Sequence, residues 1–298
     1  MNISNKFFIA WFALSSLFAV SCGDESENLT PSEPEPDVFA VDPSRTDDEA
    51  MIRKAFYENT GIHLLFTDSL IHSDGSVEML DFNWGFNTES SDECRYTYLV
   101  DNADKELAAE LLSRYFVPYI SGGKLRPYSM LPFKSIEAYL WYKSEWEYVW
   151  KSVGYIANWR CFAVNTESWS DLEPEEYREA GYRLLLDFIN ANLTYKSPEL
   201  SEFFVVSKEY YWKDISEDWF EKEDMSEIYA LGFLSYDDFW ESYPGEQDDF
   251  DDFKDLVLNH TEEEVNEMYG GYAMIMKKYQ LFRQAIADMG INLNAEIE

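Results

Sequence analysis

The longest apolar run of the chain lies at its N-terminus. Residues 7–20 are apolar except for Ser15 and Ser16, and Lys6 precedes them. A secretory signal has this order, with a positive start, an apolar stretch and small residues before the cleavage point. The run is shorter than the ~20 residues that a membrane-spanning helix needs. The pattern therefore predicts a signal peptide over residues 1–21 rather than a permanent membrane span.

The residues that end this run, Ala19-Val20-Ser21-Cys22, resemble the bacterial lipobox, although the first position of that motif more often holds Leu. The resemblance implies diacylglycerol on the Cys22 thiol, cleavage before this residue and attachment to a membrane through the lipid. The alternative is an ordinary secretory signal that a cysteine happens to follow.

Residues 22–46 are acidic and contain several prolines, with few apolar side chains. Such a segment buries too little surface to offset its ordering entropy, so we expect a disordered acidic tether after the lipidated cysteine. Acidic residues directly after that cysteine also resemble the surface-export signal of lipoproteins in bacteria with SusC/SusD-like uptake systems. We therefore expect an outer-membrane lipoprotein that faces the cell exterior, with the periplasmic face as the alternative.

The spacing of apolar residues beyond the tether predicts helices and strands in alternation. Helices are expected over 46–59, 103–119, 174–192, 262–268 and 272–289, and strands over 62–66, 95–100 and 161–164. Thr46-Asp47-Asp48-Glu49 is a good capping sequence, and Pro174 suits a first helical turn. About 250 residues suit one large domain or two closely packed ones. We expect one domain, 47–298, with an α/β part over about 47–160 and a helical C-terminal part over about 222–298.

The segment from Lys134 to Trp159 is the most aromatic part of the chain. Trp141, Trp146 and Trp150 follow one another at spacings of five and four, partly on one side of a helix. This spacing favours packing in the core. The alternative is that tryptophan and tyrosine faces stack on sugar rings or pack on peptides.

The net charge changes the set of possible partners. It is −35 for the whole chain. Such a surface repels nucleic acid phosphates and anionic lipid, so neither is expected as a partner. Besides Cys22 the chain has only Cys94 and Cys161, which could form one disulfide in an oxidising envelope or remain two thiols.

Common catalytic motifs are missing from the sequence. The three histidines, His63, His72 and His260, are not spaced to place two imidazoles on one helix face. His63 lies in an apolar run, where a structural imidazole is the better interpretation. The chain also has no Gly-x-Ser-x-Gly motif, P-loop or dinucleotide-binding fingerprint.

One predicted helix carries a family resemblance. Its residues Arg178-Glu179-Ala180-Gly181-Tyr182, followed by Arg183-Leu184-Leu185-Leu186, resemble the helix of the SusD-associated zinc metallohydrolase lipoproteins, a family of zinc-binding metallopeptidases. The family has His-Glu-x-x-His at this place. Here the glutamate is kept and both histidines are replaced. The alternative is an ordinary amphipathic helix.

Other segments resemble the family in the same order along the chain, so the likeness covers most of 47–298. They are Phe162-Ala163-Val164-Asn165, the stretch from Glu202 to Tyr211, Gly232-Phe233-Leu234 with Asp248-Asp249-Phe250, and Tyr279 to Leu293. The resemblance implies an α+β, zincin-like metallopeptidase scaffold with a mostly helical C-terminal part. It also implies a small mixed sheet near the helix at 174–192.

The replaced residues decide what chemistry the resemblance implies. Residues four apart share a helix face, so the family's two imidazoles meet at one zinc. The guanidinium of Arg178 has no lone pair to offer, and the Tyr182 hydroxyl is a poor zinc ligand. The third family ligand aligns best with Asp252, with Asp251 or Asp255 as alternatives. We therefore expect no bound zinc and no metal site, and an ion pair between Arg178 and a carboxylate in its place.

The sequence thus predicts a binding or accessory component of a SusC/SusD-like nutrient uptake system, built on an inactive metallopeptidase scaffold. Peptides and glycans are possible ligands, and SusC/SusD-like transporter proteins are possible partners. One alternative is an active hydrolase, a peptidase with an unconventional site that uses carboxylates without a metal or with an unconventional metal. Another is a structural adaptor of a surface complex.

Overall fold

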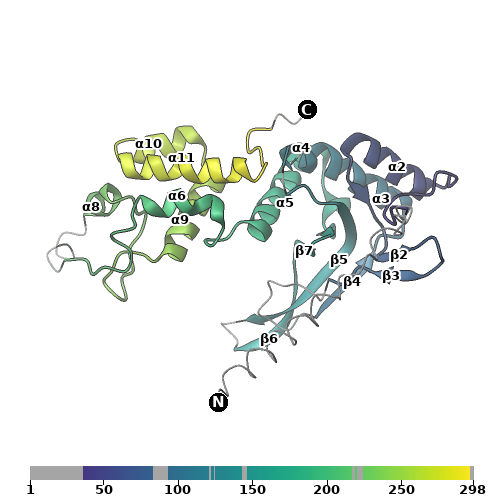
Figure 1. The fold of residues 1–298 in the computed structure, drawn as a ribbon, viewed down its shortest axis with the longest axis horizontal. Helices are drawn as coiled ribbons and strands as arrows, with labels where there is room; N and C mark the ends of the chain where they lie inside the picture. Colours follow the sequence, from purple (N-terminus) through teal and green to yellow (C-terminus); the bar gives the residue numbers. More distant parts are fainter. Residues whose placement is uncertain are drawn as a thin grey trace, which may run out of the picture. The chain divides into compact units, whose positions relative to one another are not determined.

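The computed structural model (Figure 1) describes residues 36–82, 93–120, 122–123, 125–142, 146–216, 219 and 224–295. The chain divides into two units, Met1–Asp37 and Val38–Glu298. The expected signal peptide, Cys22 and most of the expected tether lie outside the described residues. No helix among the described residues is both long and apolar enough to cross a membrane.

A mixed sheet forms the centre of the second unit. Its main path runs β1 (His63–Leu64), β5 (Ser129–Tyr142), β8 (Cys161–Asn165) and β7 (Tyr155–Ala157). The first three strands are parallel, and β7 closes the path as an antiparallel strand. Farther along β5, β4 (Cys94–Tyr98) and β6 (Glu147–Ser152) pair with it in antiparallel fashion. A separate two-stranded sheet joins β2 (Ser69–Ile71) and β3 (Val77–Met79).

The first helices follow the predicted spacing. Helix α2 (Asp48–Thr60) begins where the Asp47 carboxylate accepts the N–H of Ala50, and it ends at Gly61 in the left-handed conformation. The helix expected over 103–119 is present as α3 (Asn102–Leu111), a π-helical turn at Leu112–Phe116 and α4 (Val117–Ile120).

Helix α5 (Tyr177–Asn192) covers part of the sheet. A 3₁₀ turn at Pro174–Glu176 leads into it, as Pro174 predicted. Its buried face includes Phe188, whose ring centroid lies 5.1 Å from that of Phe162 on β8. The expectation of a small mixed sheet near this helix is therefore met.

The C-terminal part is helical. It contains α6 (Ser201–Val205), α8 (Met225–Ala230), α9 (Glu246–Asn259), α10 (Glu262–Tyr269) and α11 (Ala273–Asp288). One hydrophobic core includes Phe56 of α2, Leu185 of α5 and Phe282 of α11. The helical part and the sheet thus share a core, and the prediction of an α+β fold is confirmed.

The aromatic segment differs from its prediction. Most of the described residues of this segment lie in strands, and β5 pairs with β6 in antiparallel fashion. Tyr139 lies opposite Trp150, with ring centroids 5.3 Å apart, and the Arg95 guanidinium lies 4.2 Å from the Trp150 ring. The interpretation of the tryptophans as one helical core face is wrong, since aromatic residues also favour strands and side chains alternate there.

The bounds of the tether need a smaller correction, and the structure decides between the two possibilities for the cysteines. Residues 38–46 belong to the compact unit, where the Phe39 side chain is buried and the Arg53 guanidinium donates to the Phe39 carbonyl oxygen.

Cys94 pairs with residue 138 of β5 and Cys161 with residue 129. These positions are nine residues apart, about 30 Å along a strand. Such a separation excludes a disulfide between them, and burial raises the pKa of the Cys161 thiol to about 12.

Candidate functional site

The residues that align with the zinc-binding motif lie on α5 and contact different neighbours. The Arg178 and Glu179 side chains are exposed, and Glu179 forms an ion pair with Arg183 one turn later. Tyr182 is half-buried, and its hydroxyl donates to the carbonyl oxygen of Leu258 on α9 at 2.9 Å. Burial raises the pKa of Tyr182 above its usual range, so this hydroxyl stays protonated.

A glycine brings α5 close to the preceding helical segment. A Cβ atom on Gly181 would stand 2.2 Å from the carbonyl oxygen of Tyr115. Only glycine permits this approach, because no side-chain atom stands between the two backbones. Gly181 therefore fixes how the face with Tyr182 is presented.

The three carboxylates proposed as a third ligand lie on α9 and have local partners. Asp252 accepts a hydrogen bond from the Ser235 hydroxyl, and burial raises its pKa. Asp251 forms an ion pair with Lys254, and Asp255 accepts from the Asn259 side chain. Helix α9 meets Tyr182 at Leu258, six residues after Asp252, or about 9 Å farther along the helix. Neither the hydrogen bond between Asp252 and Ser235 nor the contact at Leu258 places Asp252 beside α5.

The histidines also have structural surroundings. His63 is buried and stacks on Tyr57 with ring centroids 4.4 Å apart, while His72 lies 3.2 Å from the Glu78 carboxylate. His260 lies 3.9 Å from the carboxylate of Glu264. Within the described ranges, no group of three or more His, Cys, Asp and Glu side chains is arranged to hold a metal ion.

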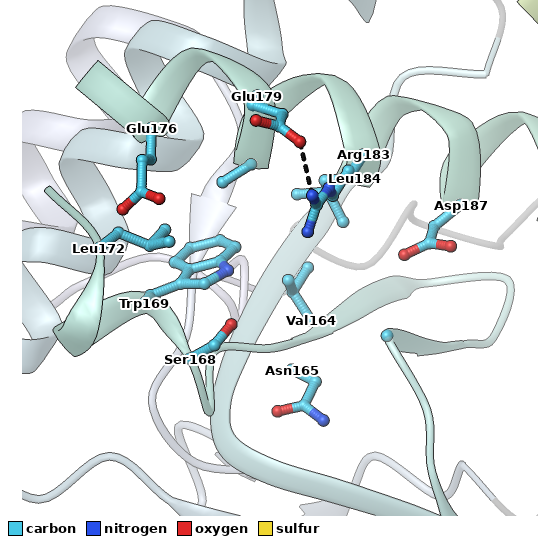
Figure 2. A pocket seen from close by; sticks show the side chains of 12 residues that line it. Val164, Asn165, Ser168, Trp169, Leu172, Glu176, Glu179, Arg183, Leu184 and Asp187 are labelled. Atoms are coloured by element: carbon cyan, nitrogen blue, oxygen red, sulfur yellow. Dashed lines mark hydrogen bonds and ion pairs between the residues drawn. The ribbon is translucent and has the colours of Figure 1, made fainter. Parts of the chain in front are cut away.

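A shallow cavity of about 130 Å³ lies between α5 and the loop after β8 (Figure 2). Glu176 of the 3₁₀ turn and Glu179 and Asp187 of α5 follow one another along one side, and the buried Trp169 lies across from them. Burial raises the pKa of the Asp187 carboxyl above its usual range. The cavity is smaller than the ~300 Å³ or more of typical small-molecule sites, so it suits an ion or a few waters.

The C-terminal part contains a fully buried ion pair that the sequence did not indicate. Lys278 of α11 donates from Nζ to both carboxylate oxygens of Asp249 on α9 at 2.5 Å. It also donates to the Gly232 carbonyl oxygen at 2.9 Å, and the Tyr211 hydroxyl donates to Asp249 at 2.6 Å.

Burial lowers the pKa of Lys278 to about 8 and raises that of Asp249 to about 6. With both side chains fully buried and both charges paired, the pair serves packing.

The described part of the chain also exposes tryptophans. Trp146, Trp159, Trp212 and Trp240 expose between 62 and 84% of their surface, although tryptophan is on average a well-buried residue. All four lie on turns or loops, and Trp146 and Trp212 adopt positive φ angles of 54° and 62°. Such backbone conformations are held only where the surroundings enforce them. Tryptophan is enriched at interfaces, so Trp146 and Trp212, exposed and held in this way, are candidates for contact with a ligand.

Comparisons of the chain with protein-family profiles, with characterised proteins and with solved structures found no match.

Proposed function

We propose that this chain is a lipid-anchored outer-membrane protein that binds a ligand at the cell surface, on a zincin-like scaffold that has lost catalysis. In this proposal Cys22 carries the lipid, and the protein serves as a binding or accessory component of a SusC/SusD-like nutrient uptake system. The family resemblance supports the association with uptake, and the acidic segment after Cys22 supports the exterior face.

The single observation that carries the loss of catalysis is the hydrogen bond from Tyr182 to Leu258. In the family that the chain resembles, the second histidine of the motif would stand at position 182 and bind zinc. Here the residue at that position joins α5 to α9 directly. Glu179, the counterpart of the family's general base, is exposed and paired with Arg183. A general base of that kind needs a metal-bound water to activate.

The arrangement of the sheet and α5 supports the zincin-like scaffold. The parallel strands β1, β5 and β8 lie side by side, and the antiparallel strand β7 pairs with β8. Helix α5 follows β8 in the chain and packs on it through Phe188. A mixed sheet beside the motif helix is what the resemblance implies.

Hydrolysis is the test of this proposal. The full-length chain, purified in detergent, is incubated with a mixed peptide library in zinc-containing buffer, and products are read by mass spectrometry. The Glu179→Gln variant is the matched control, and we expect no cleavage above its level. Cleavage by the wild type that both a chelator and this substitution abolish would show an active metallopeptidase. Cleavage that survives both would favour the alternative of a hydrolase with an unconventional site.

Copurification separates a free-standing binder from the structural adaptor. After mild solubilisation of outer membranes, an adaptor remains attached to a transporter pair, whereas a free-standing binder is recovered alone. The Cys22→Ser variant controls for proteins that follow the lipid anchor.

A further inference from the structure

The parallel strands β1, β5 and β8 are neighbours and begin at the same end of the sheet. An aromatic ring or a guanidinium lies at the start of each strand. His63 opens β1, Tyr128 directly precedes β5, and Arg160 directly precedes β8. These residues are far apart in sequence, and the parallel pairing places them side by side. With their neighbours they form an aromatic strip, which consists of Tyr57, His63, Tyr128, Phe39, Arg160 and Trp159.

The members of the aromatic strip are in contact from one end to the other. The Tyr57 and His63 rings stack at 4.4 Å, and the His63 and Tyr128 centroids lie 5.1 Å apart. Phe39 meets Tyr128 edge to face at 5.0 Å. The Arg160 guanidinium lies 4.7 Å from the Phe39 ring and 5.3 Å from the Trp159 ring. The strip is therefore one continuous series of ring–ring and cation–π contacts, stacked at Tyr57–His63 and edge to face at Phe39–Tyr128.

The strip has a buried base and an exposed top. Phe39 and His63 are buried, whereas Tyr57 and Tyr128 expose about half of their surface, 47% and 50%, and Trp159 exposes 84%. Rings that are supported by buried neighbours and partly exposed to solvent offer apolar ring surface to a ligand.

Polar contacts fix the end of the strip that contains Trp159. The Asn158 side-chain oxygen accepts the N–H groups of Arg160 at 2.9 Å and Cys161 at 2.8 Å, which holds the turn. The Arg160 guanidinium pairs with Glu78, whose other carboxylate oxygen lies 3.2 Å from Nε2 of His72. The aromatic surface is thus preorganised, and its rim carries both donors and acceptors of hydrogen bonds.

We propose that the aromatic strip binds a neutral saccharide. A pyranose presents C–H groups on its ring faces and hydroxyl groups around its rim. The exposed rings of Tyr57, Tyr128 and Trp159 can pack against the C–H groups of the sugar. The two tyrosine hydroxyls and the Arg160–Glu78 pair can form hydrogen bonds with its hydroxyl groups. This proposal rests on the proposed binding function and gives that function a site and a ligand class.

Charge and hydrogen bonding argue against other polymers. A chain with 58 acidic and 23 basic residues disfavours anionic ligands in general. A proline-rich peptide can also lie on aromatic residues, but proline lacks the N–H donor that Glu78 would accept. A saccharide hydroxyl both donates and accepts, so it can use Glu78 and Arg160 alike.

Affinity electrophoresis of the full-length chain in detergent tests the proposal. The gels contain soluble starch, xylan, galactomannan or laminarin as neutral probes, and heparin or polyproline as comparisons. We expect retardation by at least one neutral polysaccharide. Trp159→Ala and Tyr128→Ala should each weaken binding about tenfold or more, as loss of an aromatic residue that contributes strongly to an interface does. Trp240→Ala is the matched control, since Trp240 is similarly exposed but lies outside the strip.

Several results would overturn the proposal. They are absence of binding to all four neutral probes, binding of polyproline or heparin instead, or loss of binding in Trp240→Ala with retention in Trp159→Ala. The Trp159 side chain is largely exposed and that of Tyr128 is half-exposed, so we expect both variants to fold, and a melting temperature measured for each variant checks this. None of these results bears on peptide hydrolysis. A failure of saccharide binding would therefore leave the proposed loss of catalysis unaffected, and the failures of the two proposals can be distinguished.

Discussion

The Tyr182 hydroxyl lies 2.9 Å from the Leu258 carbonyl oxygen and joins the middle of α5 to the last turns of α9. Leu258 is buried, and α9 belongs to the same core as α5. The contact therefore connects the motif helix with the helical C-terminal part, and it uses a side chain that offers no imidazole nitrogen to a metal.

Removing this hydroxyl tests the contact. Tyr182→Phe keeps the ring and leaves the Leu258 carbonyl oxygen without its partner, so we expect a loss of about 1 kcal/mol in the free energy of unfolding. Denaturant unfolding followed by circular dichroism measures it. Tyr177→Phe is the control, because the Tyr177 hydroxyl has no hydrogen-bond partner among the described residues. Equal effects of the two substitutions would contradict the assigned role.

Gly181 gives a second prediction about α5. Alanine is the better helix former by about 1 kcal/mol, but its Cβ would stand 2.2 Å from the Tyr115 carbonyl oxygen. We expect Gly181→Ala to lower the free energy of unfolding by about 1–3 kcal/mol. Gly271→Ala is the control, because its Cβ would have no atom within 4 Å. A stability in Gly181→Ala equal to or above the wild type would show that the two helical segments are not this close.

The buried pair of Lys278 and Asp249 gives a third prediction. Lys278→Met leaves an unpaired carboxylate in the core, and we expect it to destabilise the fold by about 3–5 kcal/mol. Adding Asp249→Leu removes that carboxylate as well and should recover much of the loss. A double-mutant cycle in denaturant measures the coupling, with Lys254→Met and its partly exposed ion pair as the control. Additive effects of the two substitutions would contradict direct pairing.

Attachment to the membrane gives a fourth prediction, at a residue outside the described part of the chain. Cys22→Ser removes the thiol that would receive diacylglycerol. We expect this variant to lose incorporation of a labelled fatty acid and to leave the membrane fraction. Cys94→Ser and Cys161→Ser should keep both properties. Labelling of the Cys22→Ser variant would exclude the proposed anchor.

The sequence predicted features that local patterns determine. The cap at Asp47, the helix end at Gly61 and the start of α5 after Pro174 each depend on residues within one turn. The tryptophans of β5 and β6 were misassigned because spacings of five and four also occur on a hairpin. There the partner strand decides which side chains meet, as for Tyr139 and Trp150.

Long-range pairings explain what sequence patterns could not predict. Lys278 and Asp249 are 29 residues apart on two different helices. The aromatic strip depends on the parallel register of β1, β5 and β8, which places residues from three distant segments at one edge. Helix α9 contacts α5 at Leu258 and not at Asp252, because of the way in which α9 packs. An alignment of sequence motifs holds no information on that packing.

Paired histidine substitutions test whether the motif face of α5 retains the geometry of a zinc scaffold. Residues 178 and 182 share one helix face, and residues 179 and 183 share another. If a ligand such as Asp252 can approach the first face, Arg178→His with Tyr182→His should bind zinc about tenfold more tightly than Glu179→His with Arg183→His. Titration with a competing zinc dye measures both affinities. Equal affinities would weaken the family assignment.

The zinc content of the wild-type chain tests the central claim most directly. The full-length protein is dialysed against zinc-containing buffer and then against metal-free buffer, and zinc per chain is measured by atomic emission. We expect a zinc content far below one ion per chain, unchanged by Tyr182→Phe. One tightly held zinc per chain that Glu179→Gln leaves in place but Asp252→Ala removes would contradict it, because the site on α5 would then be an intact metal centre.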